Sequence, residues 1–380
     1  MKKYVFFALC FIVWGCKNKS NDNFRLSPES KSKLQISSLQ IDTIFLDSVP
    51  TSFVLHSGIQ NNLVYALDYY FCKLYYFTPE GHYKEKKLGI GHARNETAIG
   101  RIAAHTFLND GSLVLYDYQG GYHIFNKDIL LEDFFRIPYE NKKKDGSTNR
   151  EKLYNNPLDY SPVYNDNICR SYGNNVFFKV QMAYPLCNYV CSTKEQLENG
   201  ANIVETNLQQ QELGRLLAQG YPQSYYKNSI EKAIFSTVNF DITLNGDFYV
   251  TYEADSLIYK YDKDYNELEC FGFSGKNMDT NYVRITSTKE SRKHWRNERL
   301  TKGYYNWLEY VDETGLLFRS YQKGETRSTD GLQIYKDGVL IGDVSVPKGL
   351  KVMGYIAPYY YSYVIPNEEK EIMYLYRFKL

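Results

Sequence analysis

The sequence predicts an all-β protein, specifically a six-bladed β-propeller of four-stranded antiparallel blades with helical or loop insertions on one rim. Three observations predict this fold. Short apolar segments separated by turn residues recur along the chain, the recurring units have about the length of a propeller blade, and 38 Tyr and 21 Phe are present among 380 residues. Aromatic residues favour a pleated, half-buried surface, and repeats of about 40 to 50 residues with several strands each are typical of propellers.

The clearest copies of the repeated unit cover residues 61–91, 107–135, 240–275 and 311–346. Each copy alternates short apolar strands with turns, including Asn-Gly and Asp-Gly turns that favour hairpins. We place the innermost strands of these four units at Leu63, Leu113, Phe248 and Leu316.

Two further units complete the predicted ring. One lies near residues 174–182, and the other covers residues 351–380 with two apolar strands. An isolated strand at residues 39–46 precedes the first unit. Such a strand is expected to pair into the last blade, because closing the ring removes open sheet edges.

Three insertions interrupt the repeats, at residues 140–170, 193–232 and 287–302. The first is polar and predicts a long loop. The second contains a stripe of aliphatic residues at helical spacing, which predicts a helix at residues 202–219. The third is basic and also predicts a helix. Insertions between blades sit on one rim, where propellers bind partners.

The amino terminus predicts a bacterial lipoprotein. Residues 1–15 combine Lys2 and Lys3 with an apolar run too short to span a bilayer, which is typical of a signal peptide. Residues 13–16 (VWGC) resemble a lipobox, so Cys16 is the expected lipid attachment site. The alternative is an ordinary signal peptide followed by a chance cysteine.

The domain organisation follows from this start: signal peptide 1–15, lipidated cysteine and flexible tether 16–36, and propeller domain 37–380. The tether is polar and nearly free of aliphatic residues. Lys17, the residue after the lipobox cysteine, resembles the signal for sorting to the outer membrane. The acidic run that is typical of surface export is absent. We therefore expect a lipid anchor in the outer membrane, with the periplasmic and the surface-facing orientation both open.

Composition limits the class of partner. The chain has 45 basic and 44 acidic residues, so it lacks the basic excess that attracts nucleic acid, and none is expected as a partner. Tyrosines are spread along the whole chain, which favours a role in sheet packing over sugar stacking. Five cysteines follow Cys16 without zinc-site spacing, which favours buried free thiols over a metal site.

The segments at residues 88–102 and 270–285 resemble the inter-blade joins of NHL-like six-bladed propellers. Together with the lipobox and the Tyr and Asn content, the chain resembles Bacteroidetes propeller lipoproteins of uncharacterised function. The resemblance covers residues 39–380. Neither join keeps the Gly-x-Phe-x-x-Pro that follows in that family, which leaves the number of blades less certain than the fold. The family supplies no established catalytic residue to carry over.

No catalytic, cofactor or metal motif is present. The six histidines show no metal-ligand spacing, and no nucleophile elbow, phosphate loop or EF-hand series occurs. We therefore predict no catalytic residue, cofactor or metal. His92 and Arg94 lie in an inter-blade join and are candidate ligand contacts at the propeller mouth, with a purely structural or solvated role as the alternative.

The basic segment 287–302 holds the other candidate contacts for an anionic ligand or a glycan. Arginine forks match carboxylate and phosphate oxygens, and tryptophan adds a stacking surface. The alternative is a solvated basic helix with Glu290 and Glu298 as local partners. The candidate residues are Arg292, His294, Trp295, Arg296 and Arg299.

Three functional hypotheses follow. The leading one is a non-enzymatic binding or scaffolding module that presents one rim to a glycan, a peptide or an envelope protein. The second is a propeller-fold lyase, lactonase or hydrolase with its site in the central channel. Channel residues come from different blades, so their convergence cannot be predicted from one sequence. The third is a purely structural envelope component.

Overall fold

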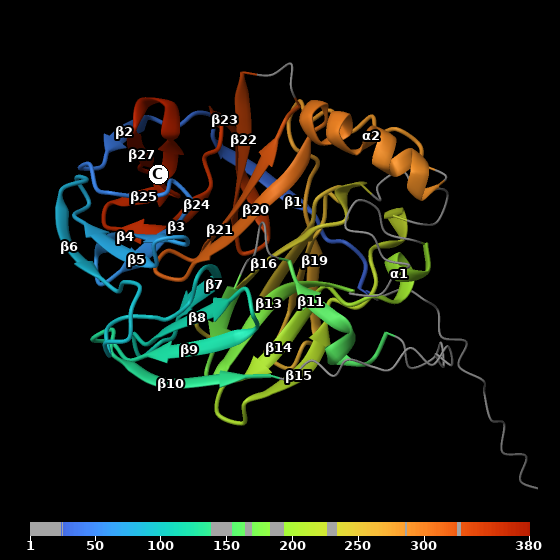
Figure 1. Cartoon of the computed structure of the whole chain (residues 1–380). Coiled ribbons are helices and arrows are strands. Elements are labelled where there is room, and N and C mark those ends of the chain that lie inside the picture. The colour runs from blue at the N-terminus through green and yellow to red at the C-terminus, as the bar shows by residue number, and fades with distance from the viewer. Residues whose placement is uncertain are drawn as a thin grey trace, which may run out of the picture.

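The structure, a computed structural model, describes residue 24 and residues 26–137, 154–163, 169–182, 194–225, 234–285, 287–324 and 328–380. Six sheets surround a central axis, so the predicted six-bladed β-propeller is confirmed (Figure 1). The predicted signal peptide, Cys16, Cys187, Cys191 and most of the insertion at 140–170 lie outside the described residues. Among the described residues, no helix has the length and apolarity needed to cross a membrane.

The first three blades follow the chain from the innermost strand outwards. Blade 1 contains β3 (Leu55–Gln60), β4 (Leu63–Asp68), β5 (Lys73–Phe77) and β6 (Tyr83–Lys87). Blade 2 contains β7 (Ile102–Phe107), β8 (Leu113–Asp117), β9 (Gly121–Phe125) and β10 (Leu131–Arg136). In blade 3 two short strands share the innermost position, so that its strands are β11 (Tyr160–Pro162), β12 (Cys169–Tyr172), β13 (Asn175–Met182), β14 (Ile203–Asn207) and β15 (Glu212–Leu217).

The last three blades complete the ring. Blade 4 contains β16 (Val238–Ile242), β17 (Phe248–Tyr252), β18 (Ile258–Tyr261) and β19 (Glu267–Phe271). Blade 5 contains β20 (Tyr304–Val311), β21 (Leu316–Gln322), β22 (Thr329–Lys336), β23 (Val339–Pro347) and, as a parallel outer strand, β1 (Lys31–Ile36). Blade 6 contains β24 (Val352–Ile356), β25 (Tyr359–Ser362), β27 (Ile372–Phe378) and β2 (Ile41–Phe45), with β26 (Ile365–Asn367) also paired to β27.

The positions predicted for the innermost strands are wrong by one strand. Leu63, Leu113, Phe248 and Leu316 belong to β4, β8, β17 and β21, the second strands of their blades, and the predicted unit at 174–182 is the second strand β13. The physical reason is burial. Strand β4 is buried almost throughout, whereas β3 faces the channel and is largely half-buried. Hydropathy therefore marks the second strand of a blade more strongly than the first.

The helix predicted at residues 202–219 is also wrong, because this segment forms the β14–β15 hairpin of blade 3. Ile203, Val204 and Thr206 are β-branched and favour a strand. The turn is closed by Asn207, whose side chain accepts a hydrogen bond from the Gln210 amide at 2.8 Å. The short helix α1 (Lys194–Asn199) ends before this hairpin.

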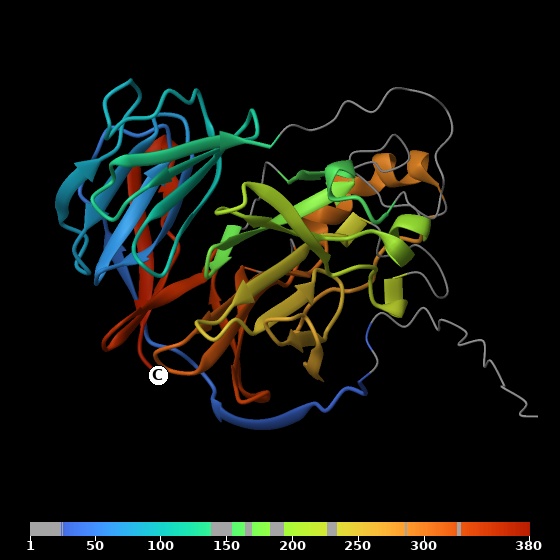
Figure 2. The same ribbon diagram turned by 90° about the horizontal axis from the view of Figure 1, so that it is seen from below.

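The amino-terminal segment closes the ring. Strand β2 pairs with β27, which confirms the prediction for residues 39–46. Residues 31–36, assigned to the tether, instead form β1 on blade 5, so the propeller begins before residue 37. Before β1, the Phe24 ring contacts Tyr259 of blade 4 at 4.9 Å and the Glu29 amide donates to the Cys270 carbonyl. We call residues 24 and 26–36 the N-terminal strap; β1 runs along the outside of the ring in Figure 2.

The hydrophobic core lies between blades. Buried apolar side chains of the described residues form clusters at each of the six blade interfaces. Leu67 of blade 1 shares a cluster with Leu115 of blade 2, and Phe318 of blade 5 packs near Phe378 of blade 6. Many tyrosines are buried in these interfaces, which supports sheet packing as their main role. The thiols of Cys72, Cys169 and Cys270 are free and buried, as predicted.

Asp68, at the end of β4, organises two turns through its buried carboxylate. It accepts hydrogen bonds from the amides of Ser52, Tyr70 and Phe71 at 2.6, 2.9 and 2.8 Å and from the Thr51 hydroxyl at 2.8 Å. A buried amide that loses its acceptor keeps its desolvation cost. The carboxylate therefore fixes the approach to β3 and the turn into β5 together.

We expect Asp68→Ala to lower the free energy of unfolding by about 2 to 3 kcal/mol, because it leaves several amides without an acceptor. Urea denaturation followed by circular dichroism measures the change. Asp110→Ala is the matched control, since exposed Asp110 accepts one amide bond, from Ser112 at 2.9 Å. Equal losses for both variants would contradict this role of Asp68.

The connections between blades share one face of the ring, which we call the insertion face, because each innermost strand begins there. The helix predicted at 287–302 is confirmed as α2 (Thr288–Thr301), which precedes β20 on this face. Ser287 caps its amino terminus by accepting a hydrogen bond from the Glu290 amide.

Candidate functional site

A pocket of about 540 Å³ runs from the insertion face into the channel, and we call it the central pocket. Gly349 and Lys351 belong to the turn before β24, at the face, whereas Trp307 and Glu309 lie within β20. Its volume is within the range of about 300 to 1,000 Å³ that is typical of ligand sites. Its chemically distinctive lining residues are His56, Tyr65, Tyr69, His105, Cys169, Arg170, Trp307, Glu309, Lys351 and Tyr363.

A buried cluster of charge joins three blades. Arg170 of β12 donates through Nη2 to Glu309 Oε2 at 2.7 Å, and its Nε lies 3.1 Å from Asp241 Oδ1 on β16. Asp241 also accepts the Tyr310 amide at 2.6 Å. The side chains of all three charged residues are at most 18% exposed. The cluster therefore ties blades 3, 4 and 5 together at the wall of the channel.

Burial sets the protonation of this cluster. Burial raises the pKa of Glu309 to about 8; Arg170 opposes the rise, and Asp241 adds to it. Burial also raises the pKa of Asp241, against the opposing charge of Arg170. Burial disfavours the charge of Arg170, but the two carboxylates outweigh it and raise the pKa of the guanidinium. The arginine is thus charged, and Glu309 holds a proton near neutral pH.

Trp307 forms an aromatic wall beside the cluster. Its indole donates to the Val352 carbonyl at 2.8 Å, and the Tyr363 ring meets it edge-on at 4.6 Å. The Lys351 ammonium lies 5.5 Å from the indole centroid, and the Arg170 guanidinium lies 5.3 Å from it. Lys351 forms no ion pair with any residue that the structure describes. Trp307 is 8% exposed, so the indole presents a small aromatic area to the pocket, with two cations near it.

The opposite part of the lining is neutral. His105 contacts the hydroxyls of Tyr65 at 3.0 Å and Tyr69 at 2.8 Å, one at each ring nitrogen. Burial lowers the pKa of His105 to about 3, with further lowering by His56 and Arg170. Burial raises the pKa of the Cys169 thiol, so this thiol is protonated and unsuited to nucleophilic attack. The described residues contain no group of three side chains placed to hold a metal ion.

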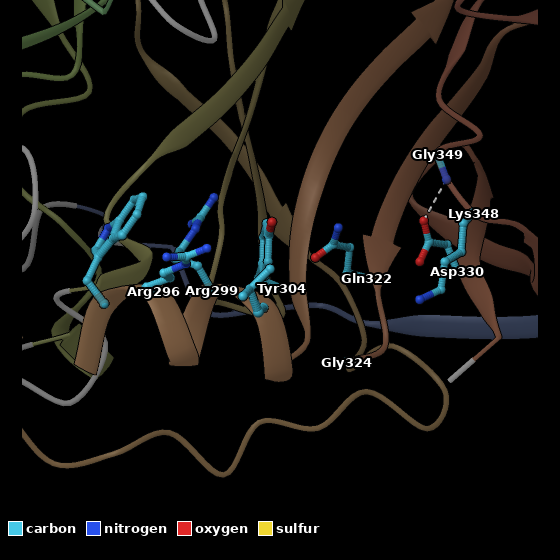
Figure 3. Close-up of a pocket in the computed structure, with 10 residues that line it drawn as sticks. Arg296, Arg299, Tyr304, Gln322, Gly324, Asp330, Lys348 and Gly349 are labelled. Carbon is cyan, nitrogen blue, oxygen red and sulfur yellow. Dashed lines mark hydrogen bonds between the residues drawn. The ribbon is translucent and has the colours of Figure 1, made fainter. Parts of the chain in front are cut away.

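The segment predicted to carry anionic-ligand contacts forms a second cavity of about 550 Å³, the rim pocket. Figure 3 shows the labelled residues in a row from α2, past β20 and β21, to β22 and the turn before β24. Of the predicted residues, Trp295, Arg296 and Arg299 line this pocket, whereas Arg292 and His294 do not. The full lining is Trp295, Arg296, Arg299, Leu300, Tyr304, Gln322, Gly324, Asp330, Lys348 and Gly349.

The cations of the rim pocket differ in their partners. Arg299 Nη1 donates to Glu253 Oε2 at 2.6 Å, and its guanidinium lies 4.1 Å from the Tyr304 ring centroid. The expected local partner Glu298 instead accepts the Val283 amide at 2.9 Å. Arg296 is exposed and forms no ion pair with a described residue. Arg299 is therefore a structural residue, and Arg296 is available to a ligand.

His92 and Arg94 line neither pocket. Their loop joins β6 to β7, and the Arg94 carbonyl accepts the Leu131 amide at the start of β10, the outermost strand of blade 2. Arg94 and His92 are both exposed. His92 and Arg94 therefore lie outside both the central pocket and the rim pocket.

Sequence reasoning missed the charged cluster of the central pocket. Arg170, Asp241 and Glu309 come from three blades, and no spacing links them. A local signal does exist, because Asp241 and Glu309 each stand between apolar residues within a short strand. A lone charge in such a strand indicates either a buried ion pair or a channel-facing position.

Comparisons with known proteins support the fold. No protein-family model matches the chain, and no curated protein matches its sequence. Among solved structures, it is similar to a member of the DUF4221 family from Bacteroides vulgatus, with a TM-score of 0.63 and 10% identity over 92% of this chain and 99% of that one. It is also matched to a luciferin-regenerating enzyme, with a TM-score of 0.45 and 9% identity over 90% of this chain and 96% of that one. At these identities the comparisons show one thing: the chain shares its six-bladed propeller fold with the Bacteroides protein.

Proposed function

We propose that this chain is a lipid-anchored lipoprotein of the bacterial outer membrane whose propeller is a binding module for a glycan. The expected anchor is Cys16, and the ligand site is the central pocket. The observation that carries the proposal is the Trp307 surface, which Tyr363 frames and which Lys351 and Arg170 flank. That the propeller belongs to the NHL-like type remains a prediction.

The chemistry of the pocket favours sugars. Aromatic rings stack on the apolar faces of pyranoses. Polar and charged side chains form hydrogen bonds with the sugar hydroxyl groups and thereby fix the orientation of the sugar. Glu309, Arg170 and Lys351 supply donors and acceptors within the same cavity. A peptide ligand or an envelope protein remains as an alternative occupant, and the binding experiment below discriminates among them.

The anchor is tested by replacing Cys16 with serine. Labelled palmitate is expected to enter the natural chain and not the Cys16→Ser variant, and the variant is expected to leave the membrane fraction, because stable anchoring needs acyl chains. Unchanged fractionation of the variant, together with no label in the natural chain, would remove the lipoprotein assignment.

The binding role is tested with the soluble Cys16→Ser chain on a glycan array, followed by calorimetry of the best ligand. Lys351→Met and Trp307→Phe are each expected to weaken binding by about tenfold, because the first removes a charge at similar side-chain volume and the second reduces the aromatic surface. Tyr83→Ala, an exposed aromatic on β6, is the control. Binding of envelope proteins or peptides alone, or binding indifferent to both pocket variants, would contradict the proposal.

A hydrolase or lyase is the second candidate, and one observation favours it. Burial raises the pKa of Glu309 to about 8, so its carboxyl is a proton donor at neutral pH in a ligand-sized pocket. Incubation of the chain with polysaccharides and an assay for new reducing ends tests this candidate. Turnover abolished in Glu309→Gln would establish the enzyme in place of the binding module.

A further inference from the structure

The rim pocket and the central pocket meet at one turn. Gly349, which precedes β24, lines both cavities. Its neighbour Lys348 lines the rim pocket, and Lys351, two residues later, lines the central pocket. Both cavities are on the insertion face, so a ligand that passes over this turn reaches both without crossing a blade.

The rim pocket carries an excess of positive charge. Because Arg299 is paired with Glu253, its lining leaves Arg296 and Lys348 against the single carboxylate of Asp330. Asp330 is only 6% exposed and accepts the Gly349 amide at 2.8 Å, so it serves to hold the turn. Arg296 and Lys348 are exposed and form no ion pair with any residue that the structure describes. The Asp330 carboxylate partly offsets the charge of Lys348 through electrostatic attraction, whereas the charge of Arg296 is directed at solvent or at a ligand.

The two pockets repeat one chemical pattern. The rim pocket has Trp295, 37% exposed, on α2 next to Arg296, with Lys348 at the other end of the pocket, and the central pocket has Trp307 beside Lys351. Each pocket thus combines an indole, which is 37% exposed in the rim pocket and 8% exposed in the central pocket, with at least one cation that forms no ion pair with a described residue. A repeated pattern suits a polymer in which each unit carries both a ring and an acid.

We propose that the two pockets are consecutive subsites for an extended acidic polysaccharide, whose chain crosses the turn at Gly349. The inference rests on the proposed glycan-binding function and specifies its ligand class. The central pocket holds one end of the chain against Trp307, and Arg296 and Lys348 bind carboxylates further along it. An acidic peptide would satisfy the cations but would leave the exposed face of Trp295 without a ring to stack on.

The experiment measures dissociation constants of the soluble Cys16→Ser chain for uronic-acid oligosaccharides, from the monosaccharide to long oligomers. Affinity is expected to rise by at least about tenfold once the oligomer spans both pockets, because the second contact is then intramolecular. Neutral oligosaccharides of equal length, made by reducing the carboxyl groups, are expected to lose this gain.

Variants show which residues are responsible for the rise in affinity with oligomer length. The double variant Arg296→Ala/Lys348→Ala is expected to abolish the length dependence and to leave the affinity for the shortest oligomer unchanged. Trp295→Ala is expected to reduce the gain in part. Arg292→Ala is the matched control, since Arg292 is exposed on the same helix and lines neither pocket.

The outcomes separate this inference from the function on which it rests. Binding of short oligomers that is sensitive to Lys351→Met but shows no length dependence would overturn the two-subsite inference alone. Absence of binding to any acidic or neutral glycan would overturn both. Binding of oligoglutamate with the same dependence on Arg296 and Lys348 would replace the polysaccharide by an acidic peptide.

Discussion

Replacement of Arg170 with methionine is expected to destabilise the folded protein by about 3 to 5 kcal/mol at neutral pH. Arg170 is the cation that Asp241 and Glu309 share at 3.1 and 2.7 Å, and both carboxyl groups are buried. Without it, two buried carboxyl groups lie next to each other at the channel wall, and no other described ion pair supplies either of them with a cation. The shift of the urea denaturation midpoint measures the loss.

Two further variants make this expectation specific. The double variant Arg170→Met/Glu309→Gln is expected to recover part of the lost stability, because a neutral amide in place of the Glu309 carboxyl group cannot ionise beside Asp241. Lys31→Met is the control, since the Lys31–Glu29 pair is 71% and 79% exposed, and exposed pairs contribute about 0 to 1 kcal/mol. A loss for Arg170→Met as small as that of the control would mean that the cluster is solvated.

The stability of the protein is expected to pass through a broad maximum between about pH 4.5 and 6.5, set by two groups of the central pocket. Glu309 has its pKa raised from 4.5 to about 8, so the folded state retains a proton that the unfolded chain releases. The contribution of Glu309 to stability therefore falls as the pH rises from 4.5 to about 8. His105 has its pKa lowered from 6.5 to about 3, so the unfolded chain binds a proton first, and stability falls as pH drops below 6.5. Each proton contributes a slope of at most about 1.4 kcal/mol per pH unit, and the two slopes cancel between 4.5 and 6.5.

Single variants isolate each limb of the profile. Glu309→Gln is expected to flatten the decline between pH 6.5 and 8, although Asp241, whose pKa is also raised, contributes to stability with the same sign. His105→Gln is expected to flatten the acid decline and to retain bonding to Tyr65 and Tyr69. The difference in unfolding free energy between each variant and the natural chain, followed against pH, cancels all other groups. A difference that is constant across pH would contradict the assignment for that residue.

The fold was accessible from the sequence because each blade buries its second strand on both faces. The apolar runs of β4 and β17 are continuous and are followed by turns, so they indicate the repeat clearly. The innermost strands were misplaced because the channel requires polar side chains there. The hairpin at residues 203–217 was mistaken for a helix because leucines placed by a bulged register mimic helical spacing.

The candidate site could be predicted from the sequence only where its residues lie close together along the chain. Helix α2 brings Trp295, Arg296 and Arg299 to one pocket but leaves Arg292 and His294 outside it. The sequence could not show that Arg299 is already paired, because Glu253 is 46 residues away. The Arg170 cluster depends on which innermost strands of different blades become neighbours at the channel wall, and that arrangement exists only after the ring closes.

The N-terminal strap has a mechanical consequence if the chain is held by a lipid at Cys16. Strand β2 closes the ring, but tension from the membrane does not reach it first. The chain order places the Phe24 contacts, the Glu29–Cys270 hydrogen bond and the β1–β23 pairing before β2. Under tension, the contacts of the strap would therefore break and re-form before the β2–β27 pairing is loaded, and the ring would stay closed.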